Sequence, residues 1–164
     1  MPSDAVLYQA SALCLTYPDE NLLERLPLVR EAAPQLREFA DRAVRTPLPD
    51  LAAHYVRVFG SGNRLSLCLS RWRDGDTRGR GMSLSRLKEL YRAHGLEFTD
   101  EELPDFLPAV LEFAARTGNT DPLTEYHDGL EQLRSRLTEA GTPYASVLDA
   151  VCATLPAAHT RVRP

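Results

Sequence analysis

Apolar residues recur along most of this 164-residue chain at the spacing of an α-helix, and almost nowhere at the alternating spacing of a strand. Apolar positions three or four residues apart form one face of an amphipathic helix. The rows are Leu51, Tyr55, Val58 and Phe59; Leu65, Cys68, Leu69 and Trp72; Leu84, Leu87, Leu90 and Tyr91; Phe106, Leu107, Val110, Leu111 and Ala114; Leu123, Tyr126, Leu130, Leu133 and Leu137; and Tyr144, Val147, Leu148, Val151 and Leu155. The sequence therefore predicts an all-α fold.

Helix start and stop residues divide the chain between these rows. Predicted starts are Asp19, Pro34, Pro49 with Asp50, Asp100 and Pro143, and predicted stops are Gly60, Gly95, Gly118 and Gly141. Because a proline deep inside a helix removes a backbone hydrogen bond and costs about 3 kcal/mol, the helix near Pro108 should begin between residues 105 and 108, with 101–104 as a separate turn. We predict one bundle of about eight or nine helices over residues 1–156, followed by a flexible tail at 157–164.

The charge balance and the amino terminus narrow the kind of partner. The net charge of -4 argues against a general affinity for nucleic acid. No run of 18 apolar residues occurs, so direct insertion into a membrane is not expected. The first residues lack the positive charge and unbroken apolar run of an export signal, because Asp4, Gln9 and Ser11 interrupt them. We expect a cytoplasmic protein.

Residues that could carry catalysis or bind a metal are scattered. The four histidines, His54, His94, His127 and His159, are far apart, and no paired metal-binding motif contains them. The three cysteines, Cys14, Cys68 and Cys152, sit singly among apolar neighbours, which is typical of reduced, buried thiols. No nucleophile motif is present. We expect neither an enzyme nor a bound cofactor.

Residues 72–81 combine three glycines with three arginines ahead of the row that starts at Leu84. Such a loop could hold a phosphate or carboxylate at a helix amino terminus, with Arg78 and Arg80 as partners. However, the stretch lacks the lysine of a phosphate-binding loop, and no strand is predicted before it. The favoured interpretation is a connector in which Asp76 or Thr77 caps a helix and the arginines pair with acidic side chains elsewhere.

An acidic stretch runs from Asp100 to Asp105 and is followed by Glu112. Carboxylates are stabilising in the first turn of a helix, which is an ordinary reason for them to occur there. Asp105 and Glu112 are seven residues apart and should share a helix face away from Val110. That face should either be solvated or meet a basic peptide.

Several motifs in order carry a resemblance to a known family. They are the run Tyr55 to Phe59, Ser66-Leu67, the stretch Gly75 to Leu87 with Arg78, Arg80 and Gly81, and the stretch Glu102 to Phe113 with Leu103, Asp105 and Leu107. Over residues 51–115 the chain resembles the NarJ family of nitrate reductase assembly chaperones, within the wider group of twin-arginine leader-binding chaperones. Phe106 stands where that family usually has histidine.

The resemblance implies a TorD-like helical fold and a chaperone with no activity of its own. It would bind the N-terminus of the apo catalytic (alpha) subunit of a respiratory nitrate reductase, support insertion of the molybdenum cofactor and an iron–sulfur cluster, and delay docking on the membrane anchor. Cofactor delivery proteins are further candidate partners. The candidate client-binding residues are Tyr55, Phe59, Leu67, Arg78, Arg80, Leu103, Asp105, Phe106, Leu107 and Glu112.

Within this set the roles differ. Phe59, Leu67, Phe106 and Leu107 would line or support an apolar groove, Asp105 and Glu112 would meet basic residues of the client, and Arg78 and Arg80 would position the loop between helices. For the four apolar residues, a place in the core is an equal alternative. Two other functions stay open: a leader-peptide chaperone for another molybdoenzyme, and a helical nucleotide-binding protein that uses the Gly75–Gly81 loop.

Overall fold

The computed structural model describes residues 2–60, 65–74, 78–97 and 103–156, with side chains from residue 4 onward. Within these ranges every regular element is helical, which confirms the all-α prediction. The elements are α1 (Pro2–Cys14), α2 (Glu20–Ala32), the 3-10 helix η1 (Pro34–Leu36), α3 (Arg37–Val44), α4 (Leu48–Phe59), α5 (Arg71–Asp74), α6 (Arg78–Ala93), α7 (Leu107–Thr117), α8 (Asp121–Glu125), α9 (His127–Ala140) and α10 (Tyr144–Cys152). The predicted start at Asp100 and the predicted tail at 157–164 lie outside the described residues.

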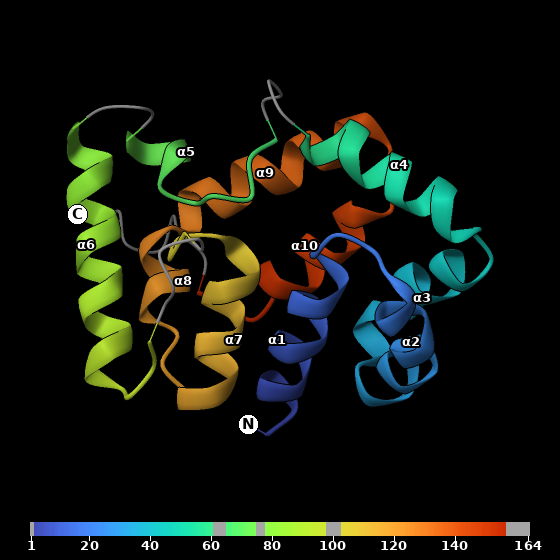
Figure 1. The fold of residues 1–164 in the computed structure, drawn as a ribbon, viewed down its shortest axis with the longest axis horizontal. Coiled ribbons are helices and arrows are strands. Elements are labelled where there is room, and N and C mark those ends of the chain that lie inside the picture. The colour runs from blue at the N-terminus through green and yellow to red at the C-terminus, as the bar shows by residue number, and fades with distance from the viewer. Residues whose placement is uncertain (1, 61–64, 75–77, 98–102, 157–164) are drawn as a thin grey trace.

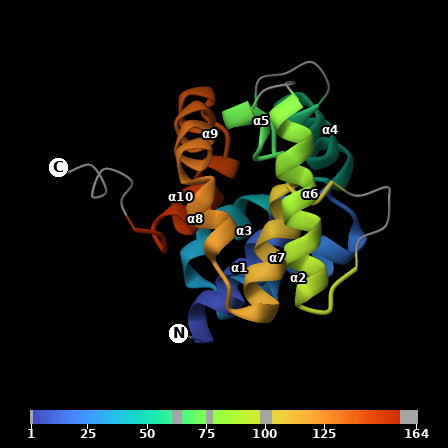
Figure 2. The same cartoon turned by 90° about the vertical axis from the view of Figure 1, so that its left-hand side faces the viewer.

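The helices pack around a central pair formed by α1 and α7, which lie side by side (Figure 1). Helix α10 packs on α1 and on α9, while α2 and α3 form one end of the molecule. Helix α6 stands at the opposite end and is nearest the viewer in Figure 2. The amino-terminal and carboxy-terminal helices therefore meet in one shared core, as expected of a single bundle.

The core is built from the apolar rows that the sequence displays. Leu130, Leu133 and Leu137 of α9 are completely buried, as are Val147, Leu148 and Val151 of α10. Each buried leucine or valine side chain stabilises the fold by about 1.5–3 kcal/mol relative to an exposed one. The rows predicted for α4, α7 and α10 thus correctly identify the faces that hold the bundle together.

Capping residues at the amino and carboxyl ends of helices match the predicted start and stop residues. Asp19 precedes α2, and its Oδ1 accepts a hydrogen bond from the Leu22 N–H at 2.9 Å. Gly118 and Gly141 end α7 and α9 with φ of 77° and 71°, which is the left-handed region that glycine adopts without strain. Helix α7 begins at Leu107 with Pro108 in its first turn, also as predicted.

The prediction of a helix through Leu65, Cys68, Leu69 and Trp72 is wrong. Residues 65–70 are not helical, and only Arg71–Asp74 forms a short helix. The backbone of this segment hydrogen-bonds with the residues before α7: the Leu69 N–H donates to the Asp105 carbonyl at 2.9 Å, and the Leu107 N–H donates to the Leu67 carbonyl at 2.8 Å. Cys68 and Phe106 thereby form an isolated antiparallel bridge.

Two further boundaries differ from expectation. Arg78, Gly79, Arg80 and Gly81 lie in the first turn of α6 and not in a loop, while the proposed caps Asp76 and Thr77 lie outside the described residues. The row from Leu123 to Leu137 is divided at Tyr126 into α8 and α9. These short elements explain why the described residues contain ten α-helices where about eight or nine were predicted.

Candidate functional site

A buried carboxylate connects the motif residues that lie far apart in the sequence. Asp105 has no exposed surface, and its Oδ2 accepts hydrogen bonds from the Ser70 backbone N–H at 3.0 Å and the Ser70 hydroxyl at 2.6 Å. An Arg80 guanidinium nitrogen lies 3.5 Å from the same oxygen, and Arg80 Nε donates to Ser70 Oγ at 3.0 Å. A buried charge is stable only when it is paired and hydrogen-bonded. We call Ser70, Arg80 and Asp105 the buried triad.

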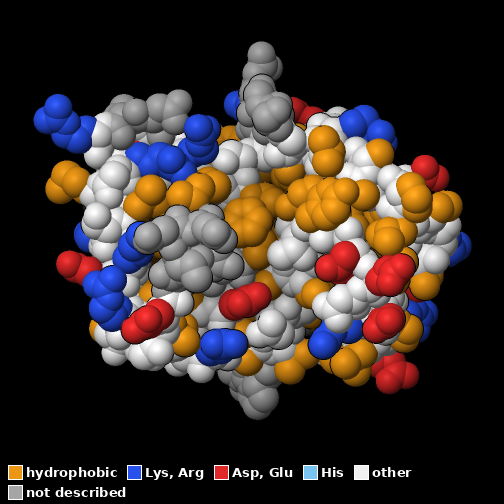
Figure 3. Space-filling view, viewed as in Figure 1, with side chains coloured by type: hydrophobic (Ala, Val, Ile, Leu, Met, Phe, Trp, Pro, Cys, Tyr) orange, Lys and Arg blue, Asp and Glu red, His pale blue; other side chains and the backbone are white. Residues whose placement is uncertain are grey.

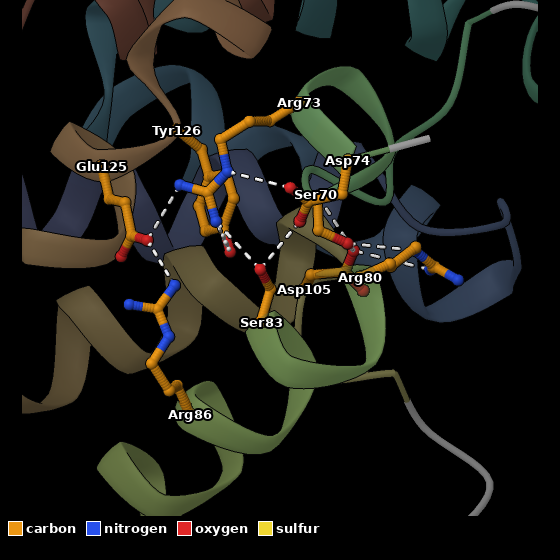
Figure 4. Close-up of polar contacts among 9 residues, drawn as sticks. All are labelled: Ser70, Arg73, Asp74, Arg80, Ser83, Arg86, Asp105, Glu125 and Tyr126. Carbon is orange, nitrogen blue, oxygen red and sulfur yellow. Dashed lines mark hydrogen bonds and ion pairs between the residues drawn. The ribbon is translucent and has the colours of Figure 1, made fainter. Parts of the chain in front are cut away.

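The buried triad corrects the expectation that Asp105 shares a helix face with Glu112 and meets a basic peptide. Asp105 precedes α7 and faces inward, whereas Glu112 is exposed on α7. The predicted pairing of an arginine with an acidic side chain is confirmed for Arg80. Figure 4 shows Arg80 and Ser70 converging on Asp105, so α6 and the 65–70 segment are anchored to the start of α7.

A second polar cluster lies beside the triad and links α5, α6 and α8. Arg73 donates to Glu125 at 3.0 Å and to Ser83 at 2.9 Å, and its guanidinium lies 4.6 Å from the centre of the Tyr126 ring. Ser83 donates to Asp74 at 2.7 Å, and this hydrogen bond, together with Arg73, lowers the pKa of the Asp74 carboxyl. The arginines of this region therefore make internal contacts (Figure 4).

Aromatic side chains form a cluster on the opposite side of the 65–70 segment. Tyr55 lies 5.8 Å from Tyr17 and 5.1 Å from Phe59, measured between ring centres, and its hydroxyl donates to the Leu15 carbonyl at 3.0 Å. The Phe59 ring packs 5.0 Å from the buried ring of Tyr144. Tyr17 is 57% exposed, so the cluster reaches the surface.

Phe106 is half-buried and forms the antiparallel bridge to Cys68. Burial, and to a lesser extent the nearby Cys68, raises the pKa of Tyr55 to about 12. Leu103, 43% exposed, lies in the same turn because its carbonyl accepts from the Phe106 N–H at 3.1 Å. We call Tyr17, Tyr55, Phe59, Leu103 and Phe106 the aromatic surface. Figure 3 shows hydrophobic side chains gathered in a band across the face seen in Figure 1.

The structure places eight of the ten sequence-predicted site residues in three groups and leaves two outside them. Tyr55, Phe59, Leu103 and Phe106 are at least partly accessible and lie in the aromatic surface. Leu67 and Leu107 are buried core residues that support it, and Asp105 and Arg80 belong to the buried triad. Arg78 and Glu112 are exposed and lie apart from these groups, on α6 and α7.

Sequence reasoning missed several contributors. Tyr17 is the most exposed member of the aromatic surface, and its signal is its position just before Pro18 and the Asp19 cap, where a large apolar residue has no helix of its own to pack in. Ser70 and Ser83 carry no sequence signal, because short hydroxyl side chains become informative only once their partners are known.

The thiols and histidines are not arranged for chemistry in the described part of the chain. Burial raises the pKa of both Cys14 and Cys152 to about 12, which keeps them as unreactive thiols. Among the described residues no group of three His, Cys, Asp or Glu side chains could hold a metal ion. No helix formed by these residues has the length and apolarity to cross a bilayer.

This fold and site define a class: a protein whose described residues form a helical bundle, in which buried polar groups hold the segments together while some aromatic side chains reach the surface. A putative redox enzyme maturation protein from Archaeoglobus fulgidus has a similar fold, with a TM-score of 0.73 and 23% identity over 94% of this chain and 93% of that one. Residues 25–149 match the nitrate reductase delta subunit family. The chain belongs to that family.

Individual relatives agree with this assignment. The chain is 32% identical over 162 residues to a protein of Bacillus subtilis named as a probable nitrate reductase molybdenum cofactor assembly chaperone, NarJ, and covers 88% of its length. It is 34% identical over 116 residues to the chaperone NarJ of Escherichia coli. It is also 36% identical over 160 residues to the nitrate reductase-like protein NarX of Mycobacterium tuberculosis, of which it spans only 24%.

Proposed function

We propose that the chain is an assembly chaperone that binds the N-terminus of the catalytic subunit of a respiratory nitrate reductase while that subunit is still apo. Membership of the delta subunit family and the names of the relatives support the choice of enzyme. The observation that carries a binding role is the aromatic surface, where Tyr17 remains 57% exposed beside Tyr55 and Phe59.

An aromatic surface of this kind suits a peptide that folds as it binds. An amphipathic helix lays its apolar residues into an apolar groove, and tyrosine and phenylalanine provide large contact areas at low cost in side-chain entropy. Ordering a free peptide consumes about 2–5 kcal/mol of the interaction energy. The complex would therefore be moderate in affinity and easily released, as a temporary chaperone requires.

In this proposal the chain holds its client open in the cytoplasm. The bound N-terminus delays docking on the membrane anchor until the molybdenum cofactor and an iron–sulfur cluster are inserted. Cofactor delivery proteins would meet the same complex. The nucleotide-binding alternative at Gly75–Gly81 is less favoured because residues 78–81 are helical and Arg80 is already engaged by Ser70 and Asp105.

Calorimetric titration with a synthetic peptide from the catalytic subunit's N-terminus tests the proposal. Wild-type chain should give saturable heat, and Tyr17→Ala should weaken binding about tenfold, since it removes an exposed aromatic contact. Val44→Ala is a matched control, because Val44 is also 57% exposed but lies at the end of α3.

Two results would count against the proposal. One is no heat from the peptide, and the other is equal weakening by Tyr17→Ala and Val44→Ala. A parallel titration with a twin-arginine leader peptide of another molybdoenzyme distinguishes the alternative client. Tighter binding of that leader would reassign the chain to a different enzyme.

A further inference from the structure

A cavity of about 240 Å³ opens between α3, α4 and the first turn of α10, apart from the buried triad and the aromatic surface's exposed residues. Apolar walls include the rings of Phe39 and Tyr144, which lie 5.2 Å apart between centres. Arg42 of α3 and Asp50, His54 and Arg57 of α4 also line it. Nothing in the proposed chaperone function uses these polar residues.

The charges around this cavity leave a positive excess. Arg42 and Arg57 form no ion pair with any described side chain, and neither does Asp50. Arg73, Arg80 and Arg134, by contrast, each contact a carboxylate. With two arginines, one aspartate and a neutral histidine, the lining carries one net positive charge.

His54 is held in place by its neighbours, and the two arginines affect its pKa. Its Nε2 lies 2.7 Å from the Thr142 hydroxyl, and its ring stacks on Tyr144 with centres 5.7 Å apart and planes 8° apart. Burial lowers the pKa of His54, and Arg57 and Arg42 lower it further. The histidine is therefore a fixed wall of a cavity with positive potential.

We propose that this cavity binds a carboxylate carried on an apolar body. Guanidinium groups donate two parallel hydrogen bonds to a carboxylate, and Arg42 and Arg57 have their donors free for such an anion. Pro143, together with the almost fully buried Phe39 and Tyr144, would contact the apolar part. One net positive charge matches a monoanion, and the cavity volume suits a group of side-chain size.

The first test is titration with phenylacetate, followed through the His54 and Tyr144 ring resonances by nuclear magnetic resonance. Saturable shifts are expected with phenylacetate and not with the neutral phenylacetamide. Arg42→Gln and Arg57→Gln should each weaken binding about tenfold, since each removes a charge-assisted contact. Both residues are exposed, so the variants should fold; Arg45→Gln, exposed at the end of α3 and outside the cavity, is the control.

A second readout is the His54 pKa itself. The groups that face His54 are Asp50 and Arg57 of its own helix, Arg42 of α3, and Thr142 and Tyr144 at the start of α10. A bound carboxylate would offset the two arginines and favour imidazolium, so phenylacetate should raise the His54 pKa and bind more tightly as the pH falls toward it.

Three results would contradict the proposed carboxylate site. Equal shifts with phenylacetate and phenylacetamide would show an apolar cavity without an anion site, and tighter binding of inorganic phosphate would exclude a carboxylate preference. Equal weakening by Arg45→Gln would show only a general charge effect.

To identify the source of the carboxylate, binding of acetyl-Leu-Glu-Leu-amide is compared with binding of phenylacetate. Tighter peptide binding supports an acidic polypeptide side chain, and tighter phenylacetate binding supports a free acid.

Discussion

At the scale of single residues, the motif that identifies the family is a structural one. Asp105 is recognisable in the sequence as an acidic residue between Pro104 and Phe106, yet it is completely buried and accepts two hydrogen bonds from Ser70. A guanidinium nitrogen of Arg80, which belongs to α6, lies 3.5 Å from the Asp105 Oδ2. The motif is thus explained by the need to hold α6 and the 65–70 segment against α7.

Asp105→Ala should lower the free energy of unfolding by about 3 kcal/mol, because it leaves Arg80 and the Ser70 N–H without their acceptor. Urea denaturation measures this. Asp128→Ala is the control, since Asp128 is exposed in the first turn of α9 and should change stability by less than about 1 kcal/mol. Similar losses in both variants would show that the triad is unimportant.

Glu112 is the acidic candidate client contact whose charge remains exposed. If it meets a basic residue of the client, Glu112→Gln should weaken the peptide complex about twofold to fivefold at low salt. The difference between Glu112→Gln and wild type should shrink at high salt because the pair is screened. A salt-independent effect in calorimetric titration would exclude an ion pair at this position.

At the scale of elements, the sequence predicts best where burial alone decides the structure. The rows of α4, α7 and α10 follow helical spacing because one face of each helix packs on the bundle. The row from Leu65 to Trp72 has the same spacing but a different structure, since its backbone hydrogen-bonds with residues 105–107. Spacing cannot reveal such a long-range pairing, and neither could it reveal the buried triad that depends on it.

Gly129 of α9 lies where α9 closely approaches α5. A Cβ there would lie 2.8 Å from the Trp72 Cβ of α5, so Gly129→Ala should destabilise the fold by about 1–3 kcal/mol despite the higher helix propensity of alanine. Gly81→Ala on α6 meets nothing within 4 Å and should stabilise by about 0.5 kcal/mol. Thermal denaturation compares the stability of the two variants. If Gly129→Ala were also stabilising, α5 would have to move aside to accommodate the added methyl group.

At the scale of the whole molecule, burial of neutral thiols and phenols should make the fold sensitive to alkali. The pKa values of Cys14 and Cys152 rise from 9.0 to about 12, and that of Tyr55 from 10.0 to about 12. Folding favours the neutral forms, so their stabilisation is complete below the unfolded values and is lost as the pH rises through the folded values.

The free energy of unfolding should therefore fall between about pH 9 and pH 12, at up to about 1.4 kcal/mol per pH unit for each group. Guanidinium denaturation at a series of pH values measures the slope. Cys14→Ala should show a shallower slope than wild type, whatever its stability at neutral pH. An unchanged slope would contradict the assignment to Cys14.

Among the described residues, the aromatic surface is supported by the buried Leu67 and Leu107, and the triad anchors the segments beside it. In the proposed function, this surface serves the assembly of nitrate reductase. Tyr17 and Phe106 are its informative positions, since one is largely exposed and the other lies half-buried at the bridge to Cys68.

The most direct test of this function is the molybdenum content of nitrate reductase, measured per catalytic subunit after purification from cells. Cells that lack the chain should yield enzyme depleted in molybdenum, wild-type chain should restore it, and a chain carrying Tyr17→Ala and Phe106→Ala should fail to do so at equal abundance. Val44→Ala should restore it fully. Unchanged molybdenum content in the absence of the chain would contradict the proposed chaperone function.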